Sequence, residues 1–227
     1  MGKTQKIGNA TIMNVDCIDY MRTVPDKFFD LAVVDPPYGI NADKMQNKAA
    51  NSRIKARKYS KAGRGWKKYK ETEWDSCLPS KNYFDSLFRS SKGQIVWGGN
   101  YMTEFLPPSM GWIVWNKCQR EFTLADGELA WSSFNKALRI FDFSRAAALQ
   151  DIRIHPTQKP VKLYEWILTN YAKPGQTIFD SHMGSGSSAI AANNLGFEYV
   201  GCELDTDYYE AACKRIAHHA LQKRLFA

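Results

Sequence analysis

The sequence predicts an α/β fold in which helices cover both faces of a mostly parallel sheet. Two stretches carry this prediction. An apolar run at residues 29–34 has the length and composition of a buried strand, and it ends abruptly at Asp35. A second strand at 177–180 leads into a glycine loop that opens a helix at 187–195, and another strand follows that helix. Strands that alternate with helices in this way are typical of a parallel sheet, which binds ligands at the carboxyl ends of its strands.

Composition and charge are those of one globular domain spanning residues 1–227. The hydrophobic fraction of 44% is enough for a single core, and no apolar run approaches the roughly 20 residues of a membrane span. The N-terminus lacks the apolar segment of a secretory signal. The five cysteines are scattered without a C-x-x-C pair, so neither a disulfide framework nor a metal site is indicated. We therefore expect a cytoplasmic protein, and the net charge of +8 favours a polyanionic partner.

The first elements of the chain alternate between strand and helix. Residues 7–15 predict a strand that ends at Asp16, and a helical turn at 18–22 follows and is closed by Pro25. An acidic residue at the end of a strand faces ligands in a parallel sheet. Capping of the short helix is an equally good interpretation of the same aspartate.

The middle of the chain predicts two further helices and two further strands. A helix at 82–89 has aromatic and leucine positions that face inward. The strand at 93–97 ends at a pair of glycines, and a short helix at 101–105 is stopped by Pro107. Another strand follows at 111–116.

The last part of the chain begins with two short strand candidates, at 128–131 and 139–143. A proline suits the first turn of the helix at 161–171. The strand after the glycine loop covers 199–203, and an amphipathic helix at 206–225 completes the chain.

The strand at 29–34 ends in a stiff corner. Pro36 and Pro37 fix the backbone and remove two amide donors, so the strand cannot continue. The corner presents the carboxylate of Asp35 as an acceptor, uncovered backbone carbonyls, and the flat face of Tyr38. A planar ring with an exocyclic amine fits these groups, because its two amine hydrogens need acceptors and its face stacks on tyrosine. A rigid loop with no ligand is the alternative interpretation.

The glycine loop is rich in small residues. Gly184 and Gly186 let the backbone approach a ligand closely and open the next helix. Glu203 follows at about the spacing at which an acid meets ribose hydroxyls, and Asp205 competes for that role. The hexapeptide His-Pro-Thr-Gln-Lys-Pro at 155–160 precedes a helix N-terminus, which attracts anions, although it can also be a turn without a ligand.

Together these stretches resemble the S-adenosylmethionine-dependent DNA methyltransferases that methylate amino groups. The resemblance runs from about Ile12 to Ile216. A tetrapeptide that begins with Asp35 resembles the adenine branch, since the cytosine-amine branch more often begins with serine. The tetrapeptide precedes the glycine loop, an order that resembles the permuted class of these enzymes. The resemblance implies a Rossmann-like class I methyltransferase fold.

The resemblance also implies roles for individual residues. The implied catalytic residues are Asp35, Pro36, Pro37 and Tyr38. The implied contacts of S-adenosylmethionine are Asp16, Cys17, Asp35, His155, Thr157, Lys159, Asp180, His182, Met183, Gly184, Ser185, Gly186, Ser187, Glu203 and Leu204. Family members commonly carry Asp-Pro-Phe before the glycines, and here His182 replaces the phenylalanine. We interpret this histidine as a packing or cofactor contact and not as a base.

Contacts with DNA are predicted for a basic loop at 41–74, which follows Tyr38 and should overhang the pocket. Aromatic residues interleave with its cations, as in segments that bind nucleic acid. The predicted DNA-binding residues are Lys44, Lys48, Arg53, Lys55, Arg57, Lys58, Lys61, Arg64, Trp66, Lys67, Lys68 and Tyr69. A solvated basic insertion is the alternative. Residues 132–154 leave room for only a minimal target-recognition segment, and Trp131 and Phe134 are candidates either for the wall of a base pocket or for the core.

The function implied is transfer of a methyl group to the 6-amino group of adenine in double-stranded DNA. The transfer is direct, and it acts on a base flipped out of the helix, at a short or relaxed target sequence. The alternatives are the exocyclic amine of cytosine, an RNA substrate, or a non-catalytic nucleic-acid-binding subunit. A homodimer and a cognate restriction nuclease are left open as partners, and no membrane partner is expected.

Overall fold

The computed structural model describes residues 2–41, 75–120, 125–149, 151 and 153–225. Among these residues, nine strands form one sheet in the order β1-β2-β9-β8-β3-β4-β6-β5-β7. The strands are β1 (Thr4–Ile7), β2 (Ala10–Met13), β3 (Phe29–Val34), β4 (Ser91–Trp97), β5 (Ile113–Asn116), β6 (Gly127–Ser132), β7 (Arg139–Asp142), β8 (Thr177–Asp180) and β9 (Glu198–Cys202). The helices are α1 (Cys17–Thr23), α3 (Lys81–Ser90), the 3₁₀ turn η2 (Gly99–Tyr101), α4 (Arg145–Ala148), α5 (Val161–Tyr171), α6 (Ser187–Leu195) and α7 (Thr206–Leu225).

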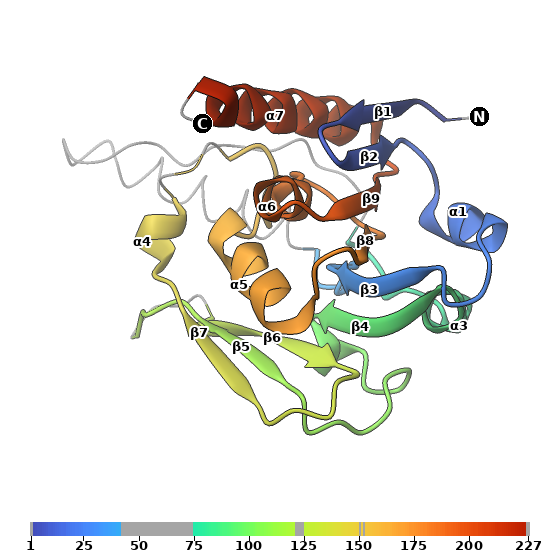
Figure 1. Cartoon of the computed structure of the whole chain (residues 1–227). Helices are drawn as coiled ribbons and strands as arrows, with labels where there is room; N and C mark the ends of the chain where they lie inside the picture. Colours follow the sequence, from blue (N-terminus) through green and yellow to red (C-terminus); the bar gives the residue numbers. More distant parts are fainter. Residues whose placement is uncertain (1, 42–74, 121–124, 150, 152, 226–227) are drawn as a thin grey trace.

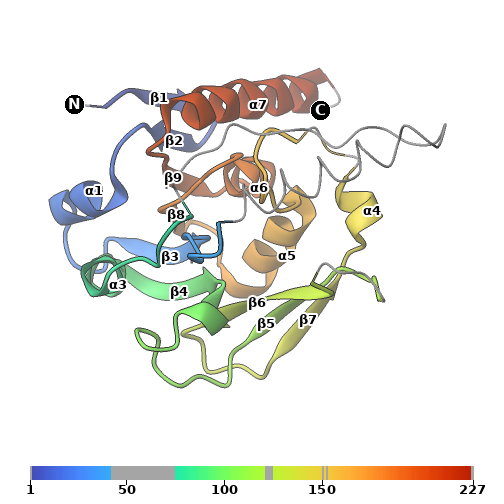
Figure 2. The same cartoon turned by 180° about the vertical axis from the view of Figure 1, so that it is seen from behind.

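The centre of the sheet is parallel. Strands β2, β9, β8, β3 and β4 pair side by side in one direction, as predicted for a Rossmann-like α/β fold. The edges are mixed, because β1 pairs antiparallel with β2 and β6 lies antiparallel between β4 and β5. Strand β7 then pairs parallel with β5. The two views of the cartoon show α7 along β1 and the β5-β6-β7 extension at the opposite end of the molecule (Figures 1 and 2).

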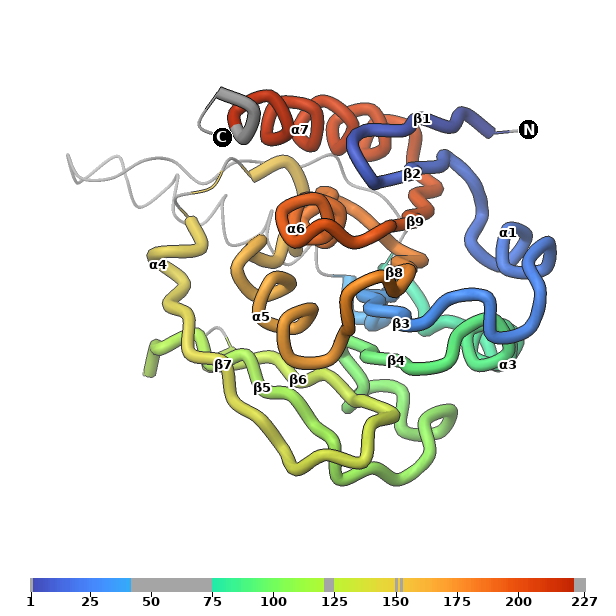
Figure 3. The backbone as a smooth tube through the Cα atoms, viewed as in Figure 1, coloured from blue at the N-terminus to red at the C-terminus, as the bar shows by residue number. Residues whose placement is uncertain are grey.

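Helices cover both faces of the central strands. Leu31 and Val33 of β3 face the core that holds α5, α6 and α7. Ala32 and Val34 face the second core, which holds α1 and α3. This alternation follows from the period of two in a strand, and a strand that is buried on both faces reads as a continuous apolar run. The backbone tube shows how the chain passes between these layers (Figure 3). None of the described helices has the length and apolarity needed to cross a lipid bilayer.

Two predicted elements differ from the structure. The run at 7–15 is not one strand: Ile7 ends β1, the chain turns at Gly8, and β2 begins at Ala10. Gly8 has a positive φ of 60°, which glycine adopts without steric cost. The predicted helix at 101–105 is replaced by η2, which starts earlier because Gly98 has a φ of +69° and turns the chain directly after β4.

Candidate active site

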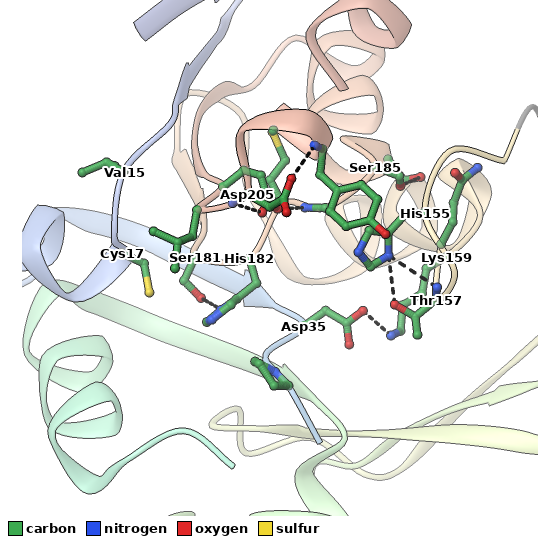
Figure 4. Close-up of a pocket in the computed structure, with 18 of the residues that line it drawn as sticks. Val15, Cys17, Asp35, His155, Thr157, Lys159, Ser181, His182, Ser185 and Asp205 are labelled. Carbon is green, nitrogen blue, oxygen red and sulfur yellow. Dashed lines mark hydrogen bonds and ion pairs between the residues drawn. The ribbon is translucent and has the colours of Figure 1, made fainter. Parts of the chain in front are cut away.

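A cavity of ≈ 420 Å³ lies at the carboxyl ends of β3, β8 and β9. Most residues predicted to contact the cofactor line it, namely Asp16, Cys17, Asp35, His155, Thr157, Lys159, His182, Met183, Gly184, Ser185, Ser187, Glu203 and Leu204. Asp35 follows β3 and Gly184 follows β8, and both border the same space. Figure 4 shows Asp35 together with Ser185 of the glycine loop. The lining also holds Asp205, the alternative to Glu203 for the ribose hydroxyls, and residues for which we predicted no cofactor contact: Val15, Gln158, Tyr164, Ser181 and Tyr208. Pro37 lines the cavity as well.

Two of the predicted cofactor residues stabilise the glycine loop but do not line the cavity. Asp180 is buried, and its carboxylate accepts hydrogen bonds from the hydroxyl of Ser188 at 2.6 Å and the amide of His182 at 3.1 Å. Burial raises the pKa of Asp180 to about 7. Gly186 has a φ of +74°, and a Cβ there would lie 2.7 Å from Cδ1 of Ile216. Both residues shape the loop without lining the cavity.

Glu203 fixes the entrance of the glycine loop. Its Oε2 accepts the amide of Gly184 at 2.8 Å, and its Oε1 accepts the amide of Asp205 at 2.9 Å. Burial raises the pKa of this carboxyl group to about 7, although both amide donors favour its ionised form. The acid at the end of β9 therefore borders the cavity, and its pKa lies close to neutral pH.

Asp16 both caps a helix and borders the cavity. Its Oδ1 accepts the amides of Ile18 at 2.7 Å and Asp19 at 3.2 Å, so it caps α1. It also lines the cavity. The neighbouring thiol of Cys17 is buried, and burial together with Asp16 raises its pKa to about 12. This cysteine is therefore a protonated wall of the cavity and not a nucleophile.

His182 behaves as a neutral aromatic ring. Burial lowers its pKa to about 4, so it carries no charge at neutral pH. Its Nδ1 lies 2.8 Å from the hydroxyl of Ser181, which lies 2.7 Å from the hydroxyl of Tyr83. The chain of hydrogen bonds holds the ring in place, and Tyr83 also meets it edge to face with ring centroids 5.4 Å apart. The ring therefore packs as a neutral aromatic side chain, and its low pKa makes it a weak base.

The segment before α5 brings a second histidine to the cavity. Burial, followed by the charge of Lys159, lowers the pKa of His155 to about 3. The hydroxyl of Thr157 lies 3.1 Å from its Nδ1, and the ring of Tyr208 meets it with centroids 4.4 Å apart. This wall of the cavity is therefore neutral and aromatic next to one ammonium group.

Asp75 holds the corner that follows β3. Its Oδ1 accepts the amides of both Tyr38 at 2.6 Å and Gly39 at 2.9 Å. Asp75 is only 2% exposed. The first two amides beyond the prolines are thus satisfied by one buried carboxylate, which fixes the turn. No sequence signal links Asp75 to this corner, because the contact joins segments far apart in the chain.

Tyr38 makes contacts at this corner through both its hydroxyl and its ring. The hydroxyl donates to Oδ1 of Asp35 at 2.6 Å, and the ring stacks on Tyr101 with centroids 5.3 Å apart. Gly98 leaves room for the ring, since a Cβ there would lie 2.2 Å from Cε1 of Tyr38. Tyr38 and Pro36 do not line the cavity themselves. The sequence predicted a stacking face, and the hydrogen bond to Asp35 was missed.

Lys159 pairs with two carboxylates in addition to lining the cavity. It lines the cavity, but its ammonium pairs with Oδ2 of Asp35 at 2.5 Å and with Oε2 of Glu128 at 3.2 Å (Figure 4 shows the pair with Asp35). Burial pushes the pKa of Asp35 up, and Lys159 opposes that effect by favouring the carboxylate. The cation of the hexapeptide therefore acts on the predicted catalytic carboxylate.

The candidates for the wall of a base pocket and for DNA binding lie outside the cavity or outside the described residues. Trp131 is 2% exposed and donates to the carbonyl of Pro107 at 2.8 Å, so it belongs to the core. Phe134 packs against Tyr171 with ring centroids 5.3 Å apart. Neither lines the cavity. The predicted DNA-binding residues, from Lys44 to Tyr69, lie outside the described residues.

Part of the chain matches the model of a known protein family. Residues 114–214, somewhat under half of the chain, match the family model of the N6/N4 DNA methylases, described as DNA methylase. The sequence is 25% identical to the Type II methyltransferase M.HinfI of Haemophilus influenzae, over 91% of this chain and 68% of that protein.

Solved structures share the fold. The M1.HpyAVI–SAM complex superimposes with a TM-score of 0.56 at 18% identity, covering 91% of this chain and 98% of that one. The PvuII DNA methyltransferase, which is cytosine-N4-specific, gives 0.57 at 12% identity over 94% and 92% of the two chains. The arrangement of strands and the cavity at their carboxyl ends are thus those of a class I methyltransferase fold. Residues 114–214 are therefore similar to the DNA methylases of that family model, and the chain as a whole is similar to M.HinfI.

Proposed function

We propose that this protein transfers a methyl group from S-adenosylmethionine to the 6-amino group of adenine in double-stranded DNA, at a short or relaxed target sequence. The observation that carries the proposal is that Asp35 and the glycine loop at Gly184 border one cavity. An acceptor for an amine and a loop for a methyl donor therefore meet where a group can pass directly between them.

The cavity suits S-adenosylmethionine, the cofactor of these DNA methylases. Among the described residues, four carboxyl groups and one ammonium line it, namely those of Asp16, Asp35, Glu203, Asp205 and Lys159. A cofactor that carries a sulfonium and an ammonium is attracted to an excess of carboxylates. Glu203 and Asp16 offer acceptors to hydroxyl and amine hydrogens. Gly184 has a φ of +52°, and a Cβ there would lie no closer than 3.7 Å to His155 on the same wall. The loop backbone is therefore open to a close ligand.

The chemistry needs an activated amine. The lone pair of the adenine amine is delocalised into the ring, so the nitrogen is a weak nucleophile. Asp35 accepts one amine hydrogen and the carbonyl of Pro36 the other, which pulls the nitrogen toward tetrahedral geometry and frees its lone pair. S-adenosylmethionine supplies a methyl group on a sulfonium whose C–S bond breaks as the N–C bond forms, with the electron pair returning to sulfur. The proton released from nitrogen passes to Asp35 and then to solvent.

No covalent intermediate with the protein is required. Transfer is direct, and its rate comes from positioning and from the charges around the amine. The protonated state of the Cys17 thiol agrees with this scheme, because a thiolate nucleophile would need a lowered pKa.

The target base is assigned from the aspartate that opens the tetrapeptide. Mass spectrometry of nucleosides from DNA incubated with protein and cofactor tests the proposal. We expect N6-methyldeoxyadenosine as the product. Finding N4-methyldeoxycytidine instead would assign cytosine as the target base, and methylation of RNA alone would change the substrate class. If no methylated nucleoside is found, the protein is a non-catalytic subunit.

Cofactor affinity should depend on pH through Glu203. Burial raises its pKa from the usual 4.5 to about 7, and a bound cation and hydroxyl donors favour its ionised form. Affinity should therefore rise with pH through 7 and fall by up to about tenfold per unit below it. The stability of the free protein depends on pH in the opposite direction. Because the pKa of Glu203 is raised in the folded state, its contribution to stability is lost as pH rises from 4.5 to about 7.

Thermal unfolding with and without cofactor measures this dependence. The increase in Tm on adding cofactor should be larger at about pH 8 than at about pH 6. Glu203→Gln should flatten that difference. An equal increase at both pH values in the unsubstituted protein would show that Glu203 does not sense the cofactor.

A further inference from the structure

The ammonium of Lys159 is shared between two carboxylates. Its three N–H donors reach Oδ2 of Asp35 at 2.5 Å, the hydroxyl of Tyr38 at 3.1 Å and Oε2 of Glu128 at 3.2 Å. The side chain of Lys159 is 2% exposed, so solvent does not compete for these donors. Its Nζ also lies 5.2 Å from the centroid of the Trp97 ring, which helps it tolerate burial.

Glu128 comes from a different part of the fold. It lies on β6, opposite Trp115 of β5, in the extension beyond the parallel strands. Its other oxygen, Oε1, pairs with Lys117 at 2.7 Å. The four charged groups form a continuous chain, Lys117, Glu128, Lys159 and Asp35, and their two positive and two negative charges cancel. Lys159 is buried and the other three groups are partly buried, and such an arrangement is tolerated because every charge has a partner.

The arrangement weakens the hold of Lys159 on Asp35. If Lys159 had Asp35 as its only partner, the ammonium would bind that carboxylate fully and reduce its capacity to accept further hydrogens. A second carboxylate at 3.2 Å draws part of the positive charge away. Lys159 thus favours the ionised form of Asp35, and Glu128 leaves that carboxylate able to accept further hydrogen bonds.

We propose that Glu128 is a positioning residue for amine methylation: by sharing the Lys159 ammonium, it leaves Asp35 free to accept the hydrogens of the target amine. The inference rests on the proposed function. When the amine docks on Asp35, Lys159 shifts its hydrogen bond toward Glu128, and the network stays neutral. The β6 strand of the antiparallel extension therefore contributes to the chemistry through a residue that does not touch the substrate.

Several titratable groups besides Glu128 act on Asp35. Lys159 and the hydroxyl of Tyr38 bond to it, while Tyr164 of α5 and Asp180 of β8 lie close enough to affect its charge. Burial raises the pKa of Asp35, and among its neighbours Glu128 raises it further. Removing the charge of Glu128 therefore lowers the pKa of Asp35, while the other groups remain unchanged.

Glu128→Gln tests the inference, because glutamine keeps the shape and removes the charge. We expect the rate of methyl transfer at saturating substrate to fall by about tenfold, the lower end of the effect of one hydrogen bond to a charged group. The acidic limb of the pH–rate profile should move to lower pH, cofactor affinity should stay unchanged, and Glu128→Asp should restore part of the rate. The matched control is Glu104→Gln, which removes an exposed charge outside the network and should leave rate and profile unchanged.

A second measurement does not depend on activity. The carbon-13 signal of the Asp35 carboxyl group in the free protein should titrate at lower pH in Glu128→Gln than in the unsubstituted protein. An unchanged Asp35 titration, or a variant with the original rate and pH profile, would overturn the role of Glu128 while leaving the proposed function intact. An unsubstituted protein that transfers no methyl group to nucleic acid would instead overturn the proposed function, and the role of Glu128 with it.

Discussion

Asp35→Asn is expected to abolish methyl transfer to DNA while cofactor binding survives. The variant keeps the shape of the side chain but removes the charge that accepts the amine hydrogens and balances Lys159. Loss of a preorganised group that stabilises the transition state lowers rates by about 10²- to 10³-fold, and we expect at least that effect here. Asp35→Ala should have the same effect. Single-turnover transfer of labelled methyl to DNA gives the rate, and calorimetric titration gives the cofactor affinity.

Asp30→Asn is the matched control for this prediction. Asp30 lies on the same strand, β3, at the end away from the cavity, where it accepts from Lys92 at 2.7 Å and from the amide of Thr177 at 2.9 Å. Its substitution should lower stability slightly and leave the transfer rate within about threefold. Transfer that persists in Asp35→Asn at the unsubstituted rate would remove Asp35 from the mechanism.

Gly98→Ala should reduce methyl transfer by about a hundredfold, because a displacement of about 1 Å in a positioned group has an effect of this size. A Cβ at this position would lie 2.2 Å from Cε1 of Tyr38, so the ring must move. Its hydroxyl then leaves Asp35, to which it now donates at 2.6 Å. The cavity lining does not include Gly98, so cofactor affinity should stay unchanged.

The matched control separates the collision from the strain of the backbone. Gly98 and Gly175 both have positive φ, +69° and +83°, so alanine costs roughly 1–2 kcal/mol at either position. A Cβ at Gly175 has no atom within 4 Å. Gly175→Ala should therefore lose stability like Gly98→Ala but keep its transfer rate. Equal rates in the two variants would show that the position of Tyr38 does not matter.

The helices and strands were predictable where the sequence contains residues that start or end them. The bounds of α5, α6, α7 and β8 agree with the prediction, because an apolar pattern is limited there by prolines or glycines. Asp35 and the glycine loop could be placed at one edge of the sheet for the same reason: parallel strands present their carboxyl ends together. The hairpin at β1 and β2 was missed because the apolar pattern of 7–15 continues through its turn.

The partners of Asp35 were not predictable from spacing. Glu128 and Asp75 reach the corner after β3 only through the register of β6 and the path of a distant segment. Lys159 belongs to the hexapeptide at 155–160, but its ammonium faces Asp35, and nothing in the residue pattern favours that partner over a ligand. Long-range contacts between charged side chains depend on tertiary packing, and neither periodicity nor residue type encodes them.

A crystal structure of the protein with S-adenosylhomocysteine tests the central claim most directly. An amine at hydrogen-bond distance from Asp35, about 2.9 Å, and about 3–3.5 Å from the methyl carbon places the sulfur within roughly 8 Å of the carboxylate. We predict that the thioether lies in the cavity between Asp35 and Gly184 at such a distance. A sulfur more than about two helical turns from Asp35, roughly 11 Å, or in another cavity, would contradict the account.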